Sequence, residues 1–385
     1  MTTDTVPTIG FFVPSGVGIG YTGPGVFLKR LIGPLRGVVN PRVYAGERPG
    51  HQTDPSLVPV RSMRVGDSGP LRQLAWALTA TWWIIVDHRR LDVVHFHGTY
   101  LYKILPALAC AAFRIPYVLV PLAAGADFSL RGRSTRIPGI SQLVRFIGRR
   151  AAGGFALGEE IAEELRQGGV PAEHVHLIMN PVSASFFQET AADRFDKQTL
   201  IFVGVIGKRK RPLLVLEILA RLREQDPTRR AIFLGPFASP SDRTAFTSAV
   251  SELGLDEAID HIEFSDDVSG YMRNSSSIFV LLSETEGIPG ALVEAMAAGL
   301  PSVVSDAGAM RDIVTESNAG FVVPADGDIA ADAVSRLLAD ESDWHDHSSR
   351  AREHAERHFR AESIAEKYFA QLRAAMNADP VSISE

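Results

Sequence analysis

A chain of 385 residues exceeds the roughly 250–300 residues at which a single hydrophobic core stops growing, so we expect two domains. Its 45% hydrophobic and 22% charged residues are typical of a globular protein and exclude a disordered or fibrous one. The 39 basic and 45 acidic side chains leave a net charge of −6. This balance excludes a global basic field, and we expect no nucleic-acid partner.

Cys110 is the only cysteine, so the chain has no internal disulfide and no Cys/His cluster with zinc spacing. The longest apolar run covers residues 74–86 and is shorter than the roughly 20 residues of a membrane span. It predicts a buried helix. We recognise no secretory leader near residue 1 and expect a cytoplasmic protein.

Short apolar runs alternate with longer helical patterns along the chain. Most runs are apolar at every position, as in strands that are buried on both faces of a parallel sheet. The first series of expected strands covers residues 9–13, 42–44, 93–96, 117–120 and 175–178. The second series covers residues 200–203, 231–234, 278–282, 302–305 and 320–323. This alternation predicts an α/β protein with doubly wound sheets.

The gap between the two series suggests the domain boundaries. We predict an N-terminal, acceptor-side domain over residues 1–183, a polar linker over 184–199 and a C-terminal domain over 200–350. Residues 351–378 are expected to add a charged amphipathic helix that packs back on the first domain. Ligands bind such sheets at the carboxyl ends of the strands, and two facing domains would form a cleft there.

A glycine-rich loop follows the first expected strand. Its Gly18, Gly20 and Gly23 match the dinucleotide fingerprint G-x-G-x-x-G, and Glu47 lies near the end of the second strand. This pattern is one sign of an NAD-dependent enzyme.

Pro24 and Gly25 interrupt that fingerprint, because they stand where the helix should already be running. Gly23 and Gly25 still allow a ligand to approach the backbone at a helix N-terminus, which favours anions. Three interpretations stay open for the loop: a dinucleotide site, a flexible turn, and a contact with sugar or phosphate.

The strand at residues 93–96 carries two histidines at its carboxyl end. His95 and His97 share one face of the strand by alternation, and His97 lies nearer the end. Each is either an interior histidine with local hydrogen bonds or a group near a ligand. We take His97 as a candidate catalytic residue.

Residues 128–158 contain six arginines and no acidic residue. Such a stretch is typical of a solvated helix face, a site for a phosphate-bearing acceptor, or a contact with an anionic membrane. Asp127 and Arg133 are therefore candidates on the acceptor side, and peripheral membrane contact is among the expected partners.

A basic turn follows the strand at residues 200–203. After Gly204 the chain reads Lys208-Arg-Lys-Arg211 just before a helical pattern. Cations at a helix N-terminus oppose the helix dipole unless an anion is bound there. The turn therefore predicts a diphosphate site.

An acidic segment follows the strand at residues 278–282. Glu286 comes at the carboxyl end of that strand, and Glu294 lies within the expected helix at residues 289–298. Gly287 and Gly290 leave backbone N–H groups accessible at the positive end of this helix. Carboxylates that accept from sugar hydroxyls and N–H groups that meet phosphate oxygens would suit a nucleotide sugar.

The spacing of Glu286 and Glu294, together with residues 299–324, resembles the E-x7-E signature of retaining glycosyltransferases of family 4, the group 1 type. The resemblance implies the α/β GT-B fold, with two Rossmann-like domains facing across a cleft. It places Glu286 on the hydroxyls of the donor sugar and Glu294 on the ribose. The backbone that would line the sugar and diphosphate comes from Gly287, Ile288, Pro289 and Gly290.

The basic turn matches the same family in part. Gly204 and Lys210 fit its pattern, but Val205 stands where the family has an arginine, so Arg209 or Arg211 is expected to supply that guanidinium. Leu122 stands where many members have a histidine, and His97 or Asp127 is expected to act near the acceptor instead.

The implied activity is that of a hexosyltransferase. It moves a sugar from a UDP or GDP sugar to a hydroxyl of a small-molecule, glycan or lipid-linked acceptor, with no cofactor. Asp326 and Asp328 resemble a metal-binding D-x-D, but we interpret them as turn residues and predict no metal requirement. The alternatives are a sugar-nucleotide epimerase of the same fold, a non-catalytic nucleotide-sugar binder and an NAD-dependent oxidoreductase.

Overall fold

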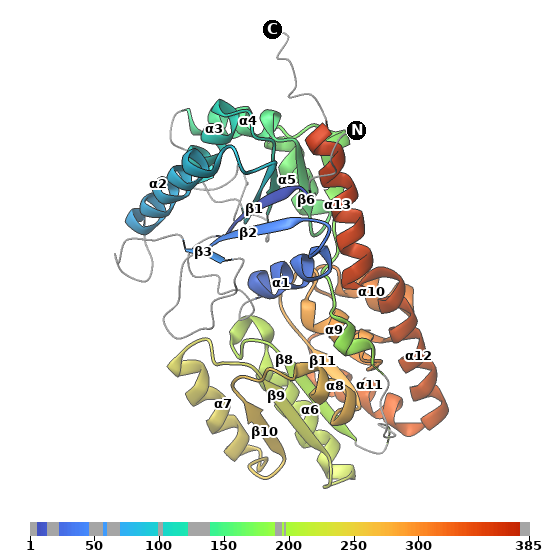
Figure 1. Cartoon of the computed structure of the whole chain (residues 1–385). Helices are drawn as coiled ribbons and strands as arrows, with labels where there is room; N and C mark the ends of the chain where they lie inside the picture. The colour runs from blue at the N-terminus through green and yellow to red at the C-terminus, as the bar shows by residue number, and fades with distance from the viewer. Residues whose placement is uncertain are drawn as a thin grey trace. The chain divides into compact units, whose positions relative to one another are not determined.

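The computed structural model describes residues 6–13, 23–45, 57–59, 70–98, 103–121, 139–188, 195 and 198–377. The chain divides into two compact units, and each has its own parallel sheet and core (Figure 1). Unit 1 comprises Met1–Pro181 and Ala361–Glu385, and unit 2 comprises Val182–Arg360.

Unit 1 contains a seven-stranded parallel sheet in the order β3-β2-β1-β4-β5-β6-β7. Its strands are β1 (Thr8–Phe12), β2 (Asn40–Ala45), β3 (Leu57–Pro59), β4 (Val93–His97), β5 (Tyr117–Val120), β6 (Gly153–Ala156) and β7 (Val175–Leu177). The strand order reverses between β1 and β4, which are hydrogen-bonded neighbours. Ligands bind α/β sheets at such a reversal, the topological switch point.

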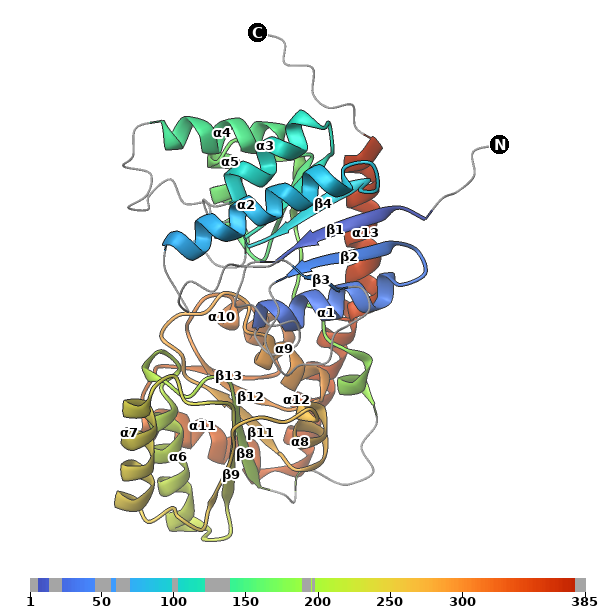
Figure 2. The ribbon, with the colours of Figure 1, turned by 60° about the vertical axis from the view of Figure 1, so that its left-hand side comes forward.

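Helices cover both faces of the unit 1 sheet (Figure 2). One core lies beneath α2 (Pro70–Asp87), α3 (Ile104–Ala112), α4 (Ile140–Arg150) and α5 (Glu159–Gln167). The other core lies beneath α1 (Gly23–Leu35) and α13 (Ala361–Asn377), which pack against each other. The last helix of the chain is therefore part of the first unit.

Unit 2 contains a six-stranded parallel sheet in the order β10-β9-β8-β11-β12-β13. Its strands are β8 (Thr199–Val203), β9 (Arg230–Leu234), β10 (Ile259–Ile262), β11 (Ile278–Leu281), β12 (Ser302–Ser305) and β13 (Gly320–Val323). The order reverses between β8 and β11. Both units thus have the same kind of switch point.

The helices of unit 2 enclose its single core. They are α6 (Pro212–Gln225), α7 (Pro240–Glu252), α8 (Val268–Asn274), α9 (Gly290–Ala297), α10 (Met310–Ser317), α11 (Gly327–Ala339) and α12 (Glu341–His358). Helix α6 packs against α7 and α11, and α9 packs against α12. The 3-10 turn η4 (Ala184–Phe187) buries two phenylalanines in this core.

The sequence analysis missed three strands, and each has a physical reason. β3 contains a proline and β10 alternates apolar and polar residues, and both lie at sheet edges where fewer apolar residues are needed. β6 reads Gly-Gly-Phe-Ala and has low strand propensity. A Cβ at Gly154 would lie 2.9 Å from Leu165 Cδ1, so a larger residue here would displace the end of this α5 side chain.

The prediction that residues 74–86 are buried is wrong. Helix α2 buries Trp76, Ala80 and Ile84, whereas Leu78 and Trp82 are exposed. Both faces of the helix are apolar, so composition could not show which face the sheet covers. Of the helices that the structure describes, none is long and apolar enough to cross a membrane.

The single helix predicted over residues 351–378 is also wrong, because α12 ends at His358 and α13 begins at Ala361. No proline or glycine marks the break. Val182 N–H donates to the Phe359 carbonyl at 2.7 Å, and Val182 and Arg360 form a parallel bridge. The two points where the chain passes between the units are therefore hydrogen-bonded to each other.

Candidate active site

The polar residues of unit 2 gather at its switch point. β8 and β11 run parallel as neighbours, so the chain segments that follow them leave the sheet at the same edge. The segment after β8 carries the basic turn, and the segment after β11 carries the acidic one. The structure thus brings together Gly204, Arg209, Lys210 and Glu286, which the sequence analysis predicted as site residues.

Gly204 makes room for Lys210. This glycine has φ +144°, a conformation that other residues rarely adopt, and a Cβ there would lie 2.9 Å from Lys210 Cε. The Lys210 stem therefore lies against the backbone of Gly204. Lys210 ends the turn η6 (Lys208–Lys210), and the left-handed Arg211 then leads into Pro212 at the start of α6.

Glu286 is the acceptor around which this site is built. Lys210 Nζ donates to Glu286 Oε1 at 2.8 Å, and Arg209 NH1 lies 2.8 Å from the same oxygen. Ser283 Oγ donates to that oxygen at 2.9 Å. The side chains of Lys210 and Glu286 are only 12% and 10% exposed, whereas that of Arg209 is half exposed.

The charge state of Glu286 follows from two opposing effects. Burial by itself would raise the pKa of this carboxyl group. The positive charge and hydrogen bond of Lys210, together with Ser283 and Arg209, outweigh burial and lower the pKa below its usual value. Glu286 is therefore an ionised carboxylate at neutral pH.

Two hydrogen bonds to backbone carbonyls join the basic turn and the acidic turn. Glu284 N–H donates to the Arg209 carbonyl at 2.8 Å, and Arg209 NH1 donates to the Thr285 carbonyl at 2.6 Å. Arg211 forms a longer ion pair, at 3.4 Å, with the exposed Glu284. Of the two arginines expected to replace the missing one at Val205, Arg209 is thus the one that contacts Glu286.

A neighbouring loop supports the acidic turn. Ser305 Oγ donates to the Ser283 carbonyl at 2.6 Å, and Ala309 N–H donates to the Gly287 carbonyl at 3.1 Å. A Cβ at Gly308 would lie 1.9 Å from the Glu286 carbonyl oxygen, so only glycine permits this approach.

Helix α9 begins directly after the acidic turn. Pro289 is its N-cap residue and Gly290 its first helical residue, one position later than predicted. Gly287 has open space beside its Cα. The helix has no acidic residue in its first turn.

Glu294 is buried within α9 and is 8% exposed. A Cβ at Gly290 would lie 3.6 Å from Glu294 Oε1, which places this carboxylate one helical turn back, beside the start of the helix. Glu286 and Glu294 are therefore both associated with the turn at residues 286–290, and their roles stay predictions.

In unit 1, His97 stands at the carboxyl end of β4, beside the other switch point. It is fully buried and stacks on Phe27 with ring centroids 5.7 Å apart. His95 Nε2 lies 3.3 Å from His97 Nδ1, and His95 Nδ1 lies 2.6 Å from the Tyr368 hydroxyl. Burial, and then the neighbouring His97 and Lys103, lower the pKa of His95 well below its usual value.

The other predicted residues of unit 1 are placed only in part. Gly23 is the first residue of α1, and Gly25 lies in its first turn. Asp127, Arg133, Leu122 and most of the glycine loop lie outside the described residues. Their roles stay predictions.

Asp326 and Asp328 have structural partners. The Asp326 carboxylate caps α11 by accepting from the N–H groups of Asp328 and Ile329 at 3.0 Å, and Asp328 pairs with Arg221. Among the residues that the structure describes, no group of three or more His, Cys, Asp or Glu side chains is placed to hold a metal ion.

Three contributors were missed by the sequence analysis. Ser283 follows strand β11 and Ser305 is the last residue of β12, and their place at strand ends could have indicated a role. Tyr368 gave no such signal, because 273 positions separate it from His95.

The arrangement in unit 2 is suited to a doubly charged anion that carries a sugar. Two cations converge on one carboxylate, and the positive end of a helix lies beside them. An arriving diphosphate would share these cations, while the carboxylate remains an acceptor for hydroxyl groups.

Two family models together match most of the chain. "Glycosyl transferase 4-like domain" matches residues 22–181, and "Glycosyl transferases group 1" matches residues 186–357. The chain is 23% identical over 295 residues to the N-acetyl-alpha-D-glucosaminyl L-malate synthase of Bacillus anthracis, covering 74% of this chain and 75% of that protein. It is 27% identical over 251 residues to the GDP-mannose:cellobiosyl-diphosphopolyprenol alpha-mannosyltransferase of Xanthomonas campestris, covering 65% of each.

A solved structure shows the same architecture. The Anabaena protein Alr3699/HepE, in complex with UDP and glucose, is similar with a TM-score of 0.72 and 18% sequence identity. The match covers 95% of this chain and 99% of that one.

Proposed function

Because this chain belongs to the group 1 glycosyltransferases and has their GT-B fold, we propose that it moves a sugar from UDP or GDP to a hydroxyl group, with retention at the anomeric carbon. The observation that carries the proposal is the contact of Lys210 with Glu286 at the switch point of unit 2. It holds a cation and an acceptor side by side at the place where α/β sheets bind ligands.

The proposed roles follow from the positions of the groups. Glu286 accepts hydrogen bonds from hydroxyls of the donor sugar, and Glu294 accepts from the ribose. Lys210 and Arg209 meet the diphosphate, with the N–H groups at the start of α9. Pro289 contributes shape only, because it has no N–H to donate.

These cations would act most strongly as the bond to the leaving group breaks. In an oxocarbenium-like transition state, negative charge develops on the departing diphosphate, and preorganised cations stabilise it. The departing phosphate oxygen would also take the proton of the acceptor hydroxyl. No side chain is then required as a general base.

The names of the relatives support either donor base. One relative is named for GDP-mannose, and the Anabaena structure contains UDP and glucose. The names also mention the acceptors of the two relatives. One is L-malate, which carries a hydroxyl group, and the other is a cellobiosyl-diphosphopolyprenol, which is linked to a lipid. We propose an acceptor of this broad class for the present chain, and a cytoplasmic location with peripheral membrane contact.

We propose further that transfer needs no metal, because Lys210 and Arg209 would neutralise the charge of the diphosphate. Transfer should continue undiminished in excess EDTA. Loss of activity in EDTA that returns with added Mg²⁺ or Mn²⁺ would contradict this part of the proposal.

Ligand screening tests the function directly. UDP or GDP should raise the melting temperature of the protein, and a panel of UDP and GDP sugars should identify one that is hydrolysed slowly without acceptor. An epimer of the donor would instead indicate an isomerase, and binding without hydrolysis or transfer would indicate a binding protein. Stabilisation by NAD alone would overturn the proposal.

A further inference from the structure

Helix α2 carries an apolar stripe on its outer face. Leu74, Leu78, Trp82 and Ile85 recur at helical spacing and are 50%, 56%, 62% and 41% exposed. The opposite face of the helix already supplies the core. The packing of unit 1 therefore does not need the side chains of this stripe.

Helix α3 extends this stripe sideways. It packs against α2, and Leu105 and Phe113 at its two ends are also exposed. Phe113 reaches back to His88, which follows α2, with ring centroids 4.5 Å apart. We call Leu74, Leu78, Trp82, Ile85, Leu105 and Phe113 the α2–α3 patch. An apolar surface of this kind on a folded protein marks an interaction site.

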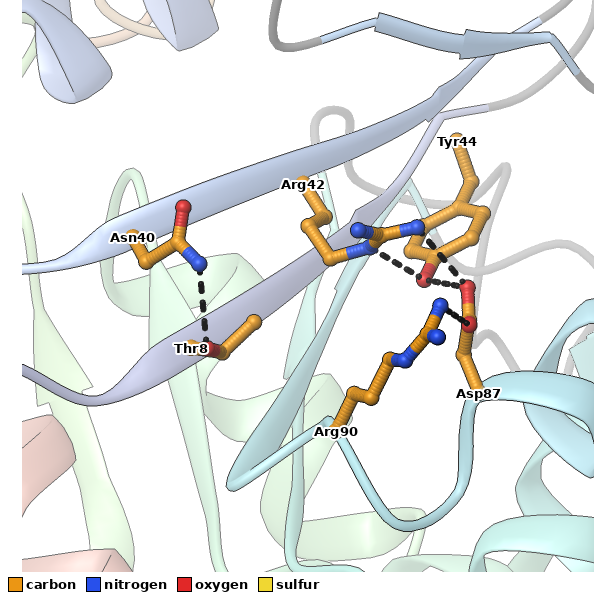
Figure 3. Close-up of polar contacts among 6 residues, drawn as sticks. All are labelled: Thr8, Asn40, Arg42, Tyr44, Asp87 and Arg90. Atoms are coloured by element: carbon orange, nitrogen blue, oxygen red, sulfur yellow. Dashed lines mark hydrogen bonds and ion pairs between the residues drawn. The ribbon is translucent and has the colours of Figure 1, made fainter.

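The acidic residue of α2 is turned away from the patch. Asp87 is buried and accepts from the Tyr44 hydroxyl at 2.7 Å and from Arg42 at 3.1 Å, with Arg90 at 3.3 Å (Figure 3). Its charge is thus neutralised inside the unit, and the same contacts fix the end of α2 to strand β2.

The exposed charges in the segments from α2 to α4 are mostly positive. Helix α4 packs against α3, and no acidic side chain occurs on α3 or α4. In the described segments from α2 to α4, the exposed arginines are Arg89, Arg90, Arg114, Arg145, Arg149 and Arg150. The exposed carboxylate in these segments, Asp92, lies at the start of β4 and accepts from Thr8 N–H.

We propose that the α2–α3 patch docks on an anionic bilayer surface. Leucine, isoleucine and tryptophan side chains on one helix face insert at the boundary of headgroups and acyl chains, while flanking arginines meet lipid phosphates. The inference rests on the peripheral membrane contact proposed above and assigns it to a surface of unit 1, which is separate from the donor site of unit 2.

Vesicle flotation tests the docking surface. The protein should float with vesicles of phosphatidylcholine and phosphatidylglycerol, and less at high salt. The double variant Leu78→Ser/Trp82→Ser should reduce binding at least about tenfold, given the area of the two side chains. Ile329→Ser is the matched control, because Ile329 is an exposed apolar residue on α11 of unit 2.

Equal binding by the wild type and the double variant would overturn this inference, as would equal binding to vesicles of phosphatidylcholine alone. A dimer that the double substitution disrupts, without lipid binding, would assign the patch to a second copy of the chain. Stabilisation by UDP or GDP should be unchanged in the double variant, so failure here is distinct from failure of the proposed function.

A second inference comes from the buried contact of Tyr368 with the two histidines. Tyr368 stands on α13, is 2% exposed and has a pKa raised by burial, so its hydroxyl keeps its proton. Within the described part of the chain, His95 Nδ1 is the one hydrogen-bond partner of this hydroxyl. A buried hydroxyl that only accepted would leave its own hydrogen unpaired, which is unfavourable.

The direction of each hydrogen bond then follows in turn. Tyr368 donates to His95 Nδ1, so the neutral His95 carries its proton on Nε2. His95 Nε2–H donates to His97 Nδ1, which must therefore be unprotonated. The proton of a neutral His97 is left on Nε2.

We propose that Tyr368 is a positioning residue that holds His97 as an Nε2–H donor. In this tautomer Nε2 of His97 is a hydrogen-bond donor and not a base. This interpretation of His97 rests on the proposed function, in which the departing phosphate takes the proton of the acceptor.

Histidine ¹⁵N NMR tests the tautomer independently of activity. In the wild-type protein His97 should show a protonated Nε2 and an unprotonated Nδ1, with its signals assigned from a His97→Gln variant. Tyr368→Phe should shift the ring signals of both His95 and His97, and should lower kcat more than it changes the KM for the donor.

Tyr117→Phe is the matched control, because it also removes a buried hydroxyl, one that donates to the Ile147 carbonyl on the other face of the sheet. It should leave the histidine signals in place. A proton on Nδ1 of His97, or unmoved signals in Tyr368→Phe, would overturn the inference. Intact UDP or GDP binding in Tyr368→Phe would show that the donor site remains.

Discussion

The two switch points of this protein occupy the same place in two similar sheets, yet their chemistry is opposite. In unit 2 the residues at the switch point are charged, and Lys210 and Arg209 converge on the carboxylate of Glu286. In unit 1 they are the fully buried His95 and His97, which lie among aromatic rings, and the buried Lys103, which donates to the His97 carbonyl.

This difference indicates that the two switch points are suited to different ligand groups. A cluster of cations around one carboxylate is suited to a ligand that brings two negative charges and several hydroxyls. A chain of neutral hydrogen-bonding groups is suited to orienting an uncharged oxygen. The shared fold supplies two equivalent positions, and the side chains decide what each position recognises.

The largest expected effect tests the charged switch point. Lys210→Ala and Glu286→Ala should each reduce kcat about 10²–10³-fold, because each removes a group that stabilises or orients the reacting centre. Circular dichroism should show intact folding. Lys208→Ala is the matched control, since Lys208 is an exposed cation of the same turn, and it should stay near wild type. Full activity in both site variants would refute the site.

A smaller effect separates the two arginines of the basic turn. Arg209→Gln should weaken binding of UDP or GDP about tenfold, because Arg209 lies 2.8 Å from Glu286 and can share its charge with a diphosphate. Arg211→Gln should weaken it less, since Arg211 pairs with the exposed Glu284. Isothermal titration calorimetry measures both, and the reverse order would assign the missing guanidinium to Arg211.

The smallest effects concern pH and differ between the switch points. The pKa of His95 is lowered in the folded protein, so the unfolded chain binds a proton that the folded chain does not. The free energy of unfolding should therefore fall as the pH drops below the ordinary histidine pKa, by up to about 1.4 kcal/mol per pH unit for one proton. His176 and His354 also have lowered pKa values, so the readout is the shallower slope of His95→Gln relative to wild type.

The pKa of Glu286 is also lowered, but from a lower starting value. Its contribution is fully present above the ordinary glutamate pKa and is lost as the pH falls through the lowered value of the folded state. Urea unfolding should thus show wild type and Glu286→Gln converging only at strongly acidic pH. Convergence already near pH 6 would contradict the low pKa.

Much of the charged site was predictable from local sequence. Gly204, Lys210 and Glu286 lie in the segments that directly follow strands, and Glu294 lies in the helix that comes next, so a strand followed by a helix leaves little freedom for where such residues go. The fold class followed from the same alternation of strands and helices. What local patterns could not show was that Lys210 and Arg209 share one oxygen of Glu286.

The neutral switch point was much less predictable. Strand alternation placed His95 and His97 on one face of β4, but the proton of His97 depends on Tyr368, which reaches them only because α13 folds back onto unit 1.

The sequence by itself thus determined the two parallel sheets and the side chains at their strand ends, because hydrophobic period and chain direction are local properties. Tertiary structure alone decided three features: the break between α12 and α13, the exposed face of α2, and the partner of His95. Each depends on which surfaces meet across long stretches of chain, and hydrophobicity along the sequence does not specify those pairings.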